Sequence, residues 1–212
     1  MSTPPSHLLY LHGFRSSPRS TKARQTGERL HAINARRNAA GRPPVRWLCP
    51  QLPPSPRQAM DEVLRSVEGV EPARLALVGS SLGGFYATYL AHRLGCRAAL
   101  LNPAVNPARD LSAQIGVLTA WHDPGSSFVF TAAHVRELHD LEVGDLSLAV
   151  PNPWRYLVVI ARDDEVLDWR EMAARYAGAQ CRIVDHGGHA LVNYATEHLD
   201  VVLDFLGIGA PA

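Results

Sequence analysis

Residues 79–83 read Gly-Ser-Ser-Leu-Gly and match the pattern G-x-S-x-G, in which a serine between small residues acts as a nucleophile. An apolar run ends just before the motif, and a helical pattern begins at Leu82. A sharp turn between a strand and a helix would expose the hydroxyl of Ser81 above the sheet. Ser80 would need a glycine at position 78, where Val78 stands. The motif therefore predicts Ser81 as a nucleophile, and the alternatives are a structural turn and a phosphate-binding loop.

A serine hydroxyl is a poor nucleophile at neutral pH, so a neutral imidazole must accept its proton. His189 ends the sequence His-Gly-Gly-His, which follows the last predicted strand and precedes the last predicted helix. His186 is the competing base, and the two histidines also resemble a pair of metal ligands. No cysteine or third histidine lies at ligand spacing, so we expect no metal. The loop predicts His189 as the general base.

A carboxylate must orient that imidazole, and in α/β-hydrolases it lies between the serine and the histidine along the chain. Asp163, Asp164 and Glu165 follow one another directly after a predicted strand. At least two of them are expected to be solvated turn charges or charges at a helix start. The spacing predicts the acid in this turn and does not choose among the three.

Acyl transfer also needs two backbone N–H groups directed at the developing oxyanion. Leu82, directly after the nucleophile, is expected to provide one, and Phe14, after the first strand, the other. Gly13 would permit a close approach of the backbone, and His12 is expected to brace the loop. The basic residues that follow are expected to be solvated helix charges, and the alternative is a site for a phosphorylated tail such as coenzyme A: Arg15, Arg19, Lys22 and Arg24.

The elements that must position these residues alternate between short apolar runs and helical segments, which is typical of a parallel sheet covered on both faces. We expect an α/β-hydrolase fold with a mostly parallel sheet in one domain, residues 1–212. Residues 106–152 lack this alternation and are expected to form a small cap insertion. The runs cover residues 8–11, 45–49, 75–78, 98–101, 156–161 and 182–184, and the helical segments cover residues 21–35, 57–67, 82–94, 167–176 and 191–206.

The composition indicates which partners to expect. The 21 Lys and Arg residues nearly balance the 20 Asp and Glu residues, so we expect neither nucleic acid nor an anionic membrane as a partner. No segment has the length and hydrophobicity of a secretion signal or a membrane span. The three cysteines lie in or beside apolar runs, which predicts free thiols and a cytoplasmic location. The chain has no Walker loop and no G-x-G-x-x-G motif, so we expect no cofactor.

Several segments taken together resemble the YqiA-like esterases, a bacterial group within the α/β-hydrolase superfamily. The resemblance runs from about residue 8 to residue 206 and is weakest over residues 106–152. It implies a cytoplasmic esterase or thioesterase without a cofactor, with Ser81 as nucleophile, Asp164 as acid and His189 as base. The segments are YLHGF at 10–14, SSP at 16–18, PQLPP at 50–54, GSSLGGFY at 79–86, NPAV at 102–105 and DEVLD at 164–168.

Two classes of function follow from this reading. The first is a serine hydrolase that cleaves a small-molecule acyl ester or acyl thioester through an acyl-enzyme. The second is a non-catalytic relative of the same fold that binds a ligand or a partner, because fold alone does not determine function. A phosphate-binding protein is disfavoured because the glycine motif lacks the lysine of a P-loop.

Overall fold

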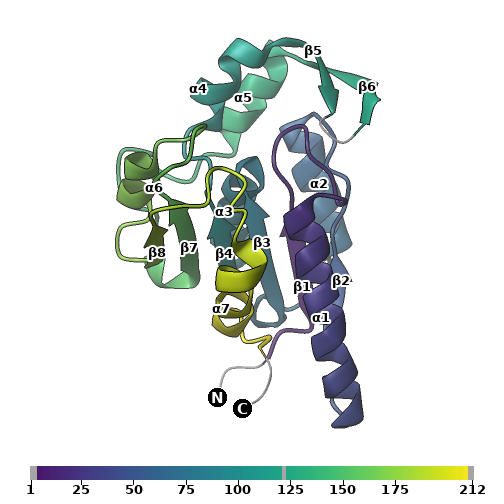
Figure 1. The fold of residues 1–212 in the computed structure, drawn as a ribbon. Helices are drawn as coiled ribbons and strands as arrows, with labels where there is room; N and C mark the ends of the chain where they lie inside the picture. The colour runs from purple at the N-terminus through teal and green to yellow at the C-terminus, as the bar shows by residue number, and fades with distance from the viewer. Residues whose placement is uncertain (1–3, 121–122, 210–212) are drawn as a thin grey trace.

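A six-stranded parallel sheet forms the centre of the molecule in the computed structural model, which describes residues 4–120 and 123–209 (Figure 1). The strand order is β2-β1-β3-β4-β7-β8, and every neighbouring pair is parallel. Each predicted strand is present within two residues of its expected limits. The strands are β1 His7–Leu11, β2 Arg46–Leu48, β3 Leu75–Ser80, β4 Arg97–Leu101, β7 Tyr156–Ala161 and β8 Gln180–Val184.

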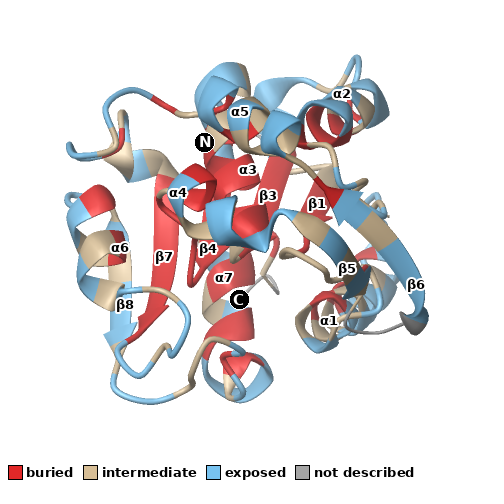
Figure 2. Cartoon of the chain, turned by 90° about the horizontal axis from the view of Figure 1, so that it is seen from above, coloured by how far each residue is buried: buried red, intermediate tan, exposed pale blue. Residues whose placement is uncertain are grey.

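The central strands are apolar throughout because both faces of the sheet are covered by helices. Alternate residues enter two separate cores: Leu9 and Leu77 pack on one side, and Leu8 and Val78 pack on the other. Figure 2 shows these strands as buried at the middle of the molecule. Successive side chains of a strand point to opposite faces, so a strand buried on both sides contains no polar alternation. The expected three-layer arrangement and α/β class are confirmed.

Helices α1 and α7 pack on one face of the sheet, and α2, α3 and α6 pack on the other (Figure 1). The expected helix at 191–206 is only partly correct. Residues 188–193 form turns around the positive φ values of Gly188 and Leu191, and a π-helix, Tyr194–His198, leads into α7. The helices are α1 Thr21–Ala39, α2 Pro56–Ser66, α3 Leu82–Leu94, α6 Trp169–Arg175 and α7 Leu199–Phe205.

The segment between β4 and β7 stands above the carboxyl ends of the strands (Figure 1). It contains α4, Pro107–Leu111, a two-stranded antiparallel hairpin of β5, Gly116–Ala120, and β6, Asp123–Phe130, and then α5, Ala132–Asp140. Phe14 holds the hairpin through edge contacts with the rings of Phe128 and Phe130. The segment therefore lies where parallel α/β sheets bind ligands.

Among the helices of the described residues, none combines the length and the hydrophobicity that a membrane span requires.

Candidate active site

Ser81 lies in the turn between β3 and α3, with φ 55° and ψ −122°. This backbone conformation is sparsely populated for any residue with a side chain and is held here by the close packing of the helix on the strands. A Cβ atom added to Gly79 would collide with the carbonyl of Gly83, and one added to Gly83 would collide with the carbonyl of Leu11. The two glycines of the motif thus allow the turn that carries Ser81.

His189 bridges Ser81 and Asp164. Its Nε2 lies 3.0 Å from Ser81 Oγ, and its Nδ1 lies 2.9 Å and 3.1 Å from the two carboxylate oxygens of Asp164. The carboxylate can only accept, so Nδ1 carries a proton, and Nε2 of the neutral ring is then free to accept from Ser81 Oγ–H. His186 is 91% exposed, with Nδ1 3.9 Å from Asp163. The fold therefore brings His189, and not His186, to the serine.

Asp164 is the carboxylate that reaches the imidazole. Its side chain is fully buried, and its Oδ1 also accepts from the backbone N–H groups of Val166 and Leu167, at 2.8 Å and 2.9 Å. These bonds offset the cost of burying its charge and fix its orientation. The other two carboxylates are solvated, as the sequence indicated, but they also have hydrogen-bond partners. Asp163 and Glu165 are exposed, yet both accept hydrogen bonds from the backbone of the histidine loop.

Phe14 and Leu82 line the same cavity as Ser81, and no hydrogen bond from the backbone amide of either residue is found among the described residues. The amide of Ser81 itself is occupied, since it donates to the carbonyl of Leu101 at 3.0 Å. His12 is buried and braces this loop as expected: Nε2 accepts from the amide of Leu52 at 3.1 Å, and Nδ1–H donates to a backbone carbonyl. The two amides expected to bind the oxyanion thus belong to residues that line the cavity at Ser81.

Gly13 lies directly against Ser81, and we expect Gly13→Ala to lower kcat by roughly 10- to 100-fold. The added Cβ would lie 3.2 Å from Ser81 Cβ and 3.6 Å from Ser81 Oγ, so the serine or the loop must shift. Gly27→Ala is the control, because its Cβ would make only an ordinary 3.4 Å contact with Trp47. Turnover and unfolding of both variants would be measured on one ester. Wild-type turnover in Gly13→Ala would contradict the expected crowding.

A cavity of about 680 Å³ opens at Ser81 and His189. A second cavity, of about 390 Å³, adjoins it at Phe14 and Leu82. The lining of the larger cavity is mixed. Its apolar residues include Leu82, Ala104, Pro107, Leu111, Val166 and Leu167, and its polar residues include Arg15, Ser16, Ser20, Thr21, Lys22, Asp110, Gln114 and Glu165.

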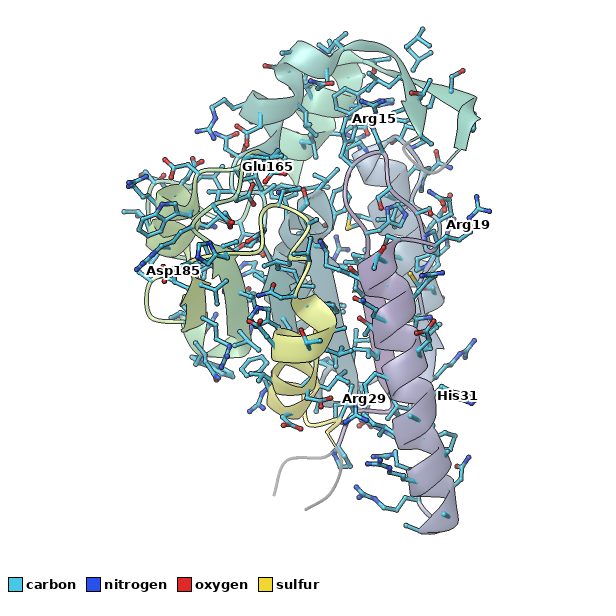
Figure 3. All side chains as sticks on the ribbon, viewed as in Figure 1. Arg15, Arg19, Arg29, His31, Glu165 and Asp185 are labelled. Carbon is cyan, nitrogen blue, oxygen red and sulfur yellow. The ribbon has the colours of Figure 1, made fainter. Side chains whose placement is uncertain are left out.

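The sequence suggested that the basic residues beyond the first loop are solvated. This is correct for two of the four. Arg15 donates to both the carbonyl and the hydroxyl of Thr119 in the hairpin, and in Figure 3 it lies just below that hairpin. Lys22 is half-buried in the cavity wall and donates to the carbonyl of Ala190 at 2.7 Å. Arg19 and Arg24 are exposed, as expected.

Lys22 is the only lysine of the chain, and burial lowers its pKa to about 8, an effect that the nearby Asp164 carboxylate opposes. A lysine in the unfolded chain titrates near 10.4. Between these values the unfolded chain binds a proton that the folded chain does not, so this group makes the free energy of unfolding increase as pH rises from about 8 to 10.4.

We therefore compare the free energies of unfolding of Lys22→Met and the wild type. The difference between them should favour the variant more strongly below pH 8 than above pH 10.4, by on the order of 1–3 kcal/mol. This advantage of the variant should shrink between pH 8 and 10.4, because Lys22 of the folded wild type is then neutral and no charge is buried. Urea unfolding of both proteins across this range measures it. Because there is one lysine, lysine-selective ¹⁵N labelling yields one side-chain signal, and a titration midpoint above 10 would contradict the prediction.

The order of the strands and the arrangement of these residues are those of the α/β-hydrolase fold. Alpha/beta hydrolase domain-containing protein 10 from mouse is similar over 97% of this chain and 92% of its own, with 14% identity and a TM-score of 0.64. Est1E from Butyrivibrio proteoclasticus, solved with ferulic acid, is similar over 98% and 88%, with 16% identity and a TM-score of 0.60. A monoacylglycerol lipase from Paleococcus ferrophilus is similar over 96% and 95%, with 12% identity and a TM-score of 0.64.

Within this class, the model of the family described as "Uncharacterised protein family (UPF0227)" matches residues 7–207. The chain belongs to this family, which is the YqiA family. The resemblance drawn from the sequence segments is thereby confirmed.

Proposed function

We propose that the protein is a serine hydrolase that cleaves acyl esters or acyl thioesters through an acyl-enzyme on Ser81. The observation that carries this proposal is the continuous hydrogen-bonded chain from Ser81 Oγ through both ring nitrogens of His189 to Asp164, with links of 3.0 Å and 2.9 Å. One of the similar structures, that from Paleococcus ferrophilus, is a monoacylglycerol lipase, which favours an acyl ester as substrate.

In the first half-reaction Ser81 Oγ attacks the acyl carbonyl carbon while His189 Nε2 takes the hydroxyl proton. The carbonyl π electrons move to oxygen, and the N–H groups of Phe14 and Leu82 stabilise that negative charge. Asp164 stabilises the imidazolium and keeps the ring oriented. The tetrahedral intermediate collapses, the bond to the alcohol or thiol breaks, and Nε2–H returns the proton to the leaving group.

In the second half-reaction water attacks the acyl-enzyme, with His189 Nε2 accepting a proton from that water. The second tetrahedral intermediate releases the carboxylic acid, and the proton returns to Ser81 Oγ. The apolar residues that line the larger cavity suit the acyl group. The segment at 106–152 supplies two of them, Pro107 and Leu111, and we assign it the role of a cap that selects the acyl group.

A fluorophosphonate probe tests the proposal, since it phosphonylates only a serine activated by a base. We expect the wild type to be labelled on the peptide that contains Ser81, located by mass mapping, and to hydrolyse a short-chain aryl ester. Paired oxygen ester and thioester substrates with the same acyl group then distinguish the two leaving groups. An absence of both labelling and hydrolysis would favour the non-catalytic, ligand-binding alternative.

A further inference from the structure

The loop that carries His189 is held through its backbone by side chains from other elements. Asp163 accepts from the amide of Gly187 at 3.2 Å and from that of Gly188 at 2.8 Å, using both carboxylate oxygens. Glu165 accepts from the amide of His189 itself at 2.9 Å. In Figure 3, Glu165 lies at the upper edge of the sheet, below the segment that contains α4 and α5. Three successive N–H groups of the loop are thus bound by two carboxylates.

The carbonyl groups of the same loop are bound by two other side chains. Asn102, fully buried at the end of β4 with φ 42°, donates to the carbonyls of Gly188 at 2.9 Å and His189 at 3.3 Å. Its Oδ1 accepts from the amide of Ala161 at 2.9 Å, which ties the loop to the end of β7. Lys22 binds the next carbonyl, that of Ala190. A single carbonyl acceptor suits the compact ammonium of lysine better than the planar fork of arginine.

We infer that these four side chains, the histidine-loop clamp, are positioning residues that hold the imidazole of His189 between Ser81 and Asp164. The clamp consists of Lys22, Asn102, Asp163 and Glu165. This inference rests on the proposed function, because it assigns the clamp to the same reaction.

The loop needs such support for a physical reason. It follows β8, an edge strand that pairs only with β7, and it contains Gly187 at φ 145° and Gly188 at φ 59°. Consecutive glycines with positive φ leave a chain many accessible conformations when nothing else fixes it. A displacement of about 1 Å between reacting groups can lower a rate by about 100-fold. Fixing the amides on both sides of the His189 Cα restricts where the ring can lie.

The two carboxylates act on the reaction far more than on the stability of the fold. Both are exposed to solvent, where a single charged contact contributes little to the free energy of unfolding. The hydrogen bond from the amide of Gly188 is the main cause that lowers the pKa of the Asp163 carboxyl, which makes this a charge-assisted bond at neutral pH. Losing these bonds should therefore reduce turnover without unfolding the protein, and this is a signature that a purely structural role would not produce.

The test compares Asp163→Asn and Glu165→Gln with Asp185→Asn as the matched control. Asp185 lies just before the same loop, but within residues 4–120 and 123–209 its carboxylate pairs only with the exposed Arg162. An asparagine at 163 can accept a hydrogen bond from only one of the two backbone amides, because it presents its NH₂ group to the other. A glutamine at 165 can still turn its oxygen toward His189 N–H. We expect kcat on a neutral aryl ester to fall roughly 10- to 100-fold in Asp163→Asn and less in Glu165→Gln, with KM within about twofold.

Two further measurements accompany turnover. The rate of fluorophosphonate labelling should fall in parallel with kcat, and hydrogen exchange at the amides of residues 187–189 should accelerate in Asp163→Asn while the core amides and the unfolding midpoint stay as in the wild type. Asp185→Asn should match the wild type in all of these. Wild-type turnover and unchanged loop exchange in both clamp variants would overturn the inference, and so would a loss of turnover that follows a lowered unfolding midpoint. A wild type that neither labels nor hydrolyses would defeat the proposed function instead, and the exchange comparison would still decide whether the clamp holds the loop.

Discussion

Ser81→Ala is expected to lower kcat for a short-chain aryl ester by at least roughly 10⁴-fold, with the fold intact. Without Oγ there is no acyl-enzyme, and the residual rate comes only from substrate binding and the oxyanion donors. The fold should persist because the turn depends on the close packing of Gly79 and Gly83, which this change leaves in place. Turnover, probe labelling and the unfolding midpoint would be compared with those of the wild type.

Ser80→Ala is the matched control, since it makes the same change of side chain one position earlier, at the end of β3. It should retain turnover and labelling. An inactive Ser80→Ala beside an active Ser81→Ala would show that the motif has been placed in the wrong register.

Asp164→Asn should lower kcat by roughly 10³- to 10⁴-fold, a much larger loss than that of either neighbouring carboxylate. An asparagine that points its NH₂ group at Nδ1 favours the tautomer with the proton on Nε2, and that ring cannot accept the Ser81 proton. An asparagine that keeps its oxygen on Nδ1 still leaves the imidazolium without its negative partner. The comparison is made by kcat on one ester across the series Asp163→Asn, Asp164→Asn and Glu165→Gln. An active Asp164→Asn beside a crippled Asp163→Asn would transfer the role of acid to Asp163.

The three carboxylates differ because consecutive side chains of a turn point in different directions. Asp164 turns inward and is fully buried against the imidazole, whereas Asp163 and Glu165 remain at the surface and reach backbone amides of the next loop. Each therefore binds the same histidine segment through a different group. This arrangement explains why one of them orients the ring while the others hold the chain that carries it.

The sequence by itself determined the fold class, the nucleophile motif and the histidine. Apolar runs separated by helical segments are local patterns, and they place β3 before and α3 after Ser81 with no reference to distant residues. The glycines at 79 and 83 and the order serine, acid, histidine are likewise readable along the chain. These features were predictable because short-range sterics and burial fix them.

Only the tertiary structure decided which carboxylate meets His189 and which side chains hold its loop. Spacing along the chain could not decide whether Asp163 or Asp164 is the acid. Asn102 was noted only as part of the segment at 102–105 that resembles the YqiA-like esterases, and nothing in the sequence pointed to its contacts with the histidine loop. The burial of Lys22 was also missed, because its partner, the carbonyl of Ala190, lies 168 residues further along the chain. Side-chain direction in a turn and contacts between remote segments depend on how the strands are ordered in the sheet, and β3, β7 and β8 come together only when the whole sheet has formed.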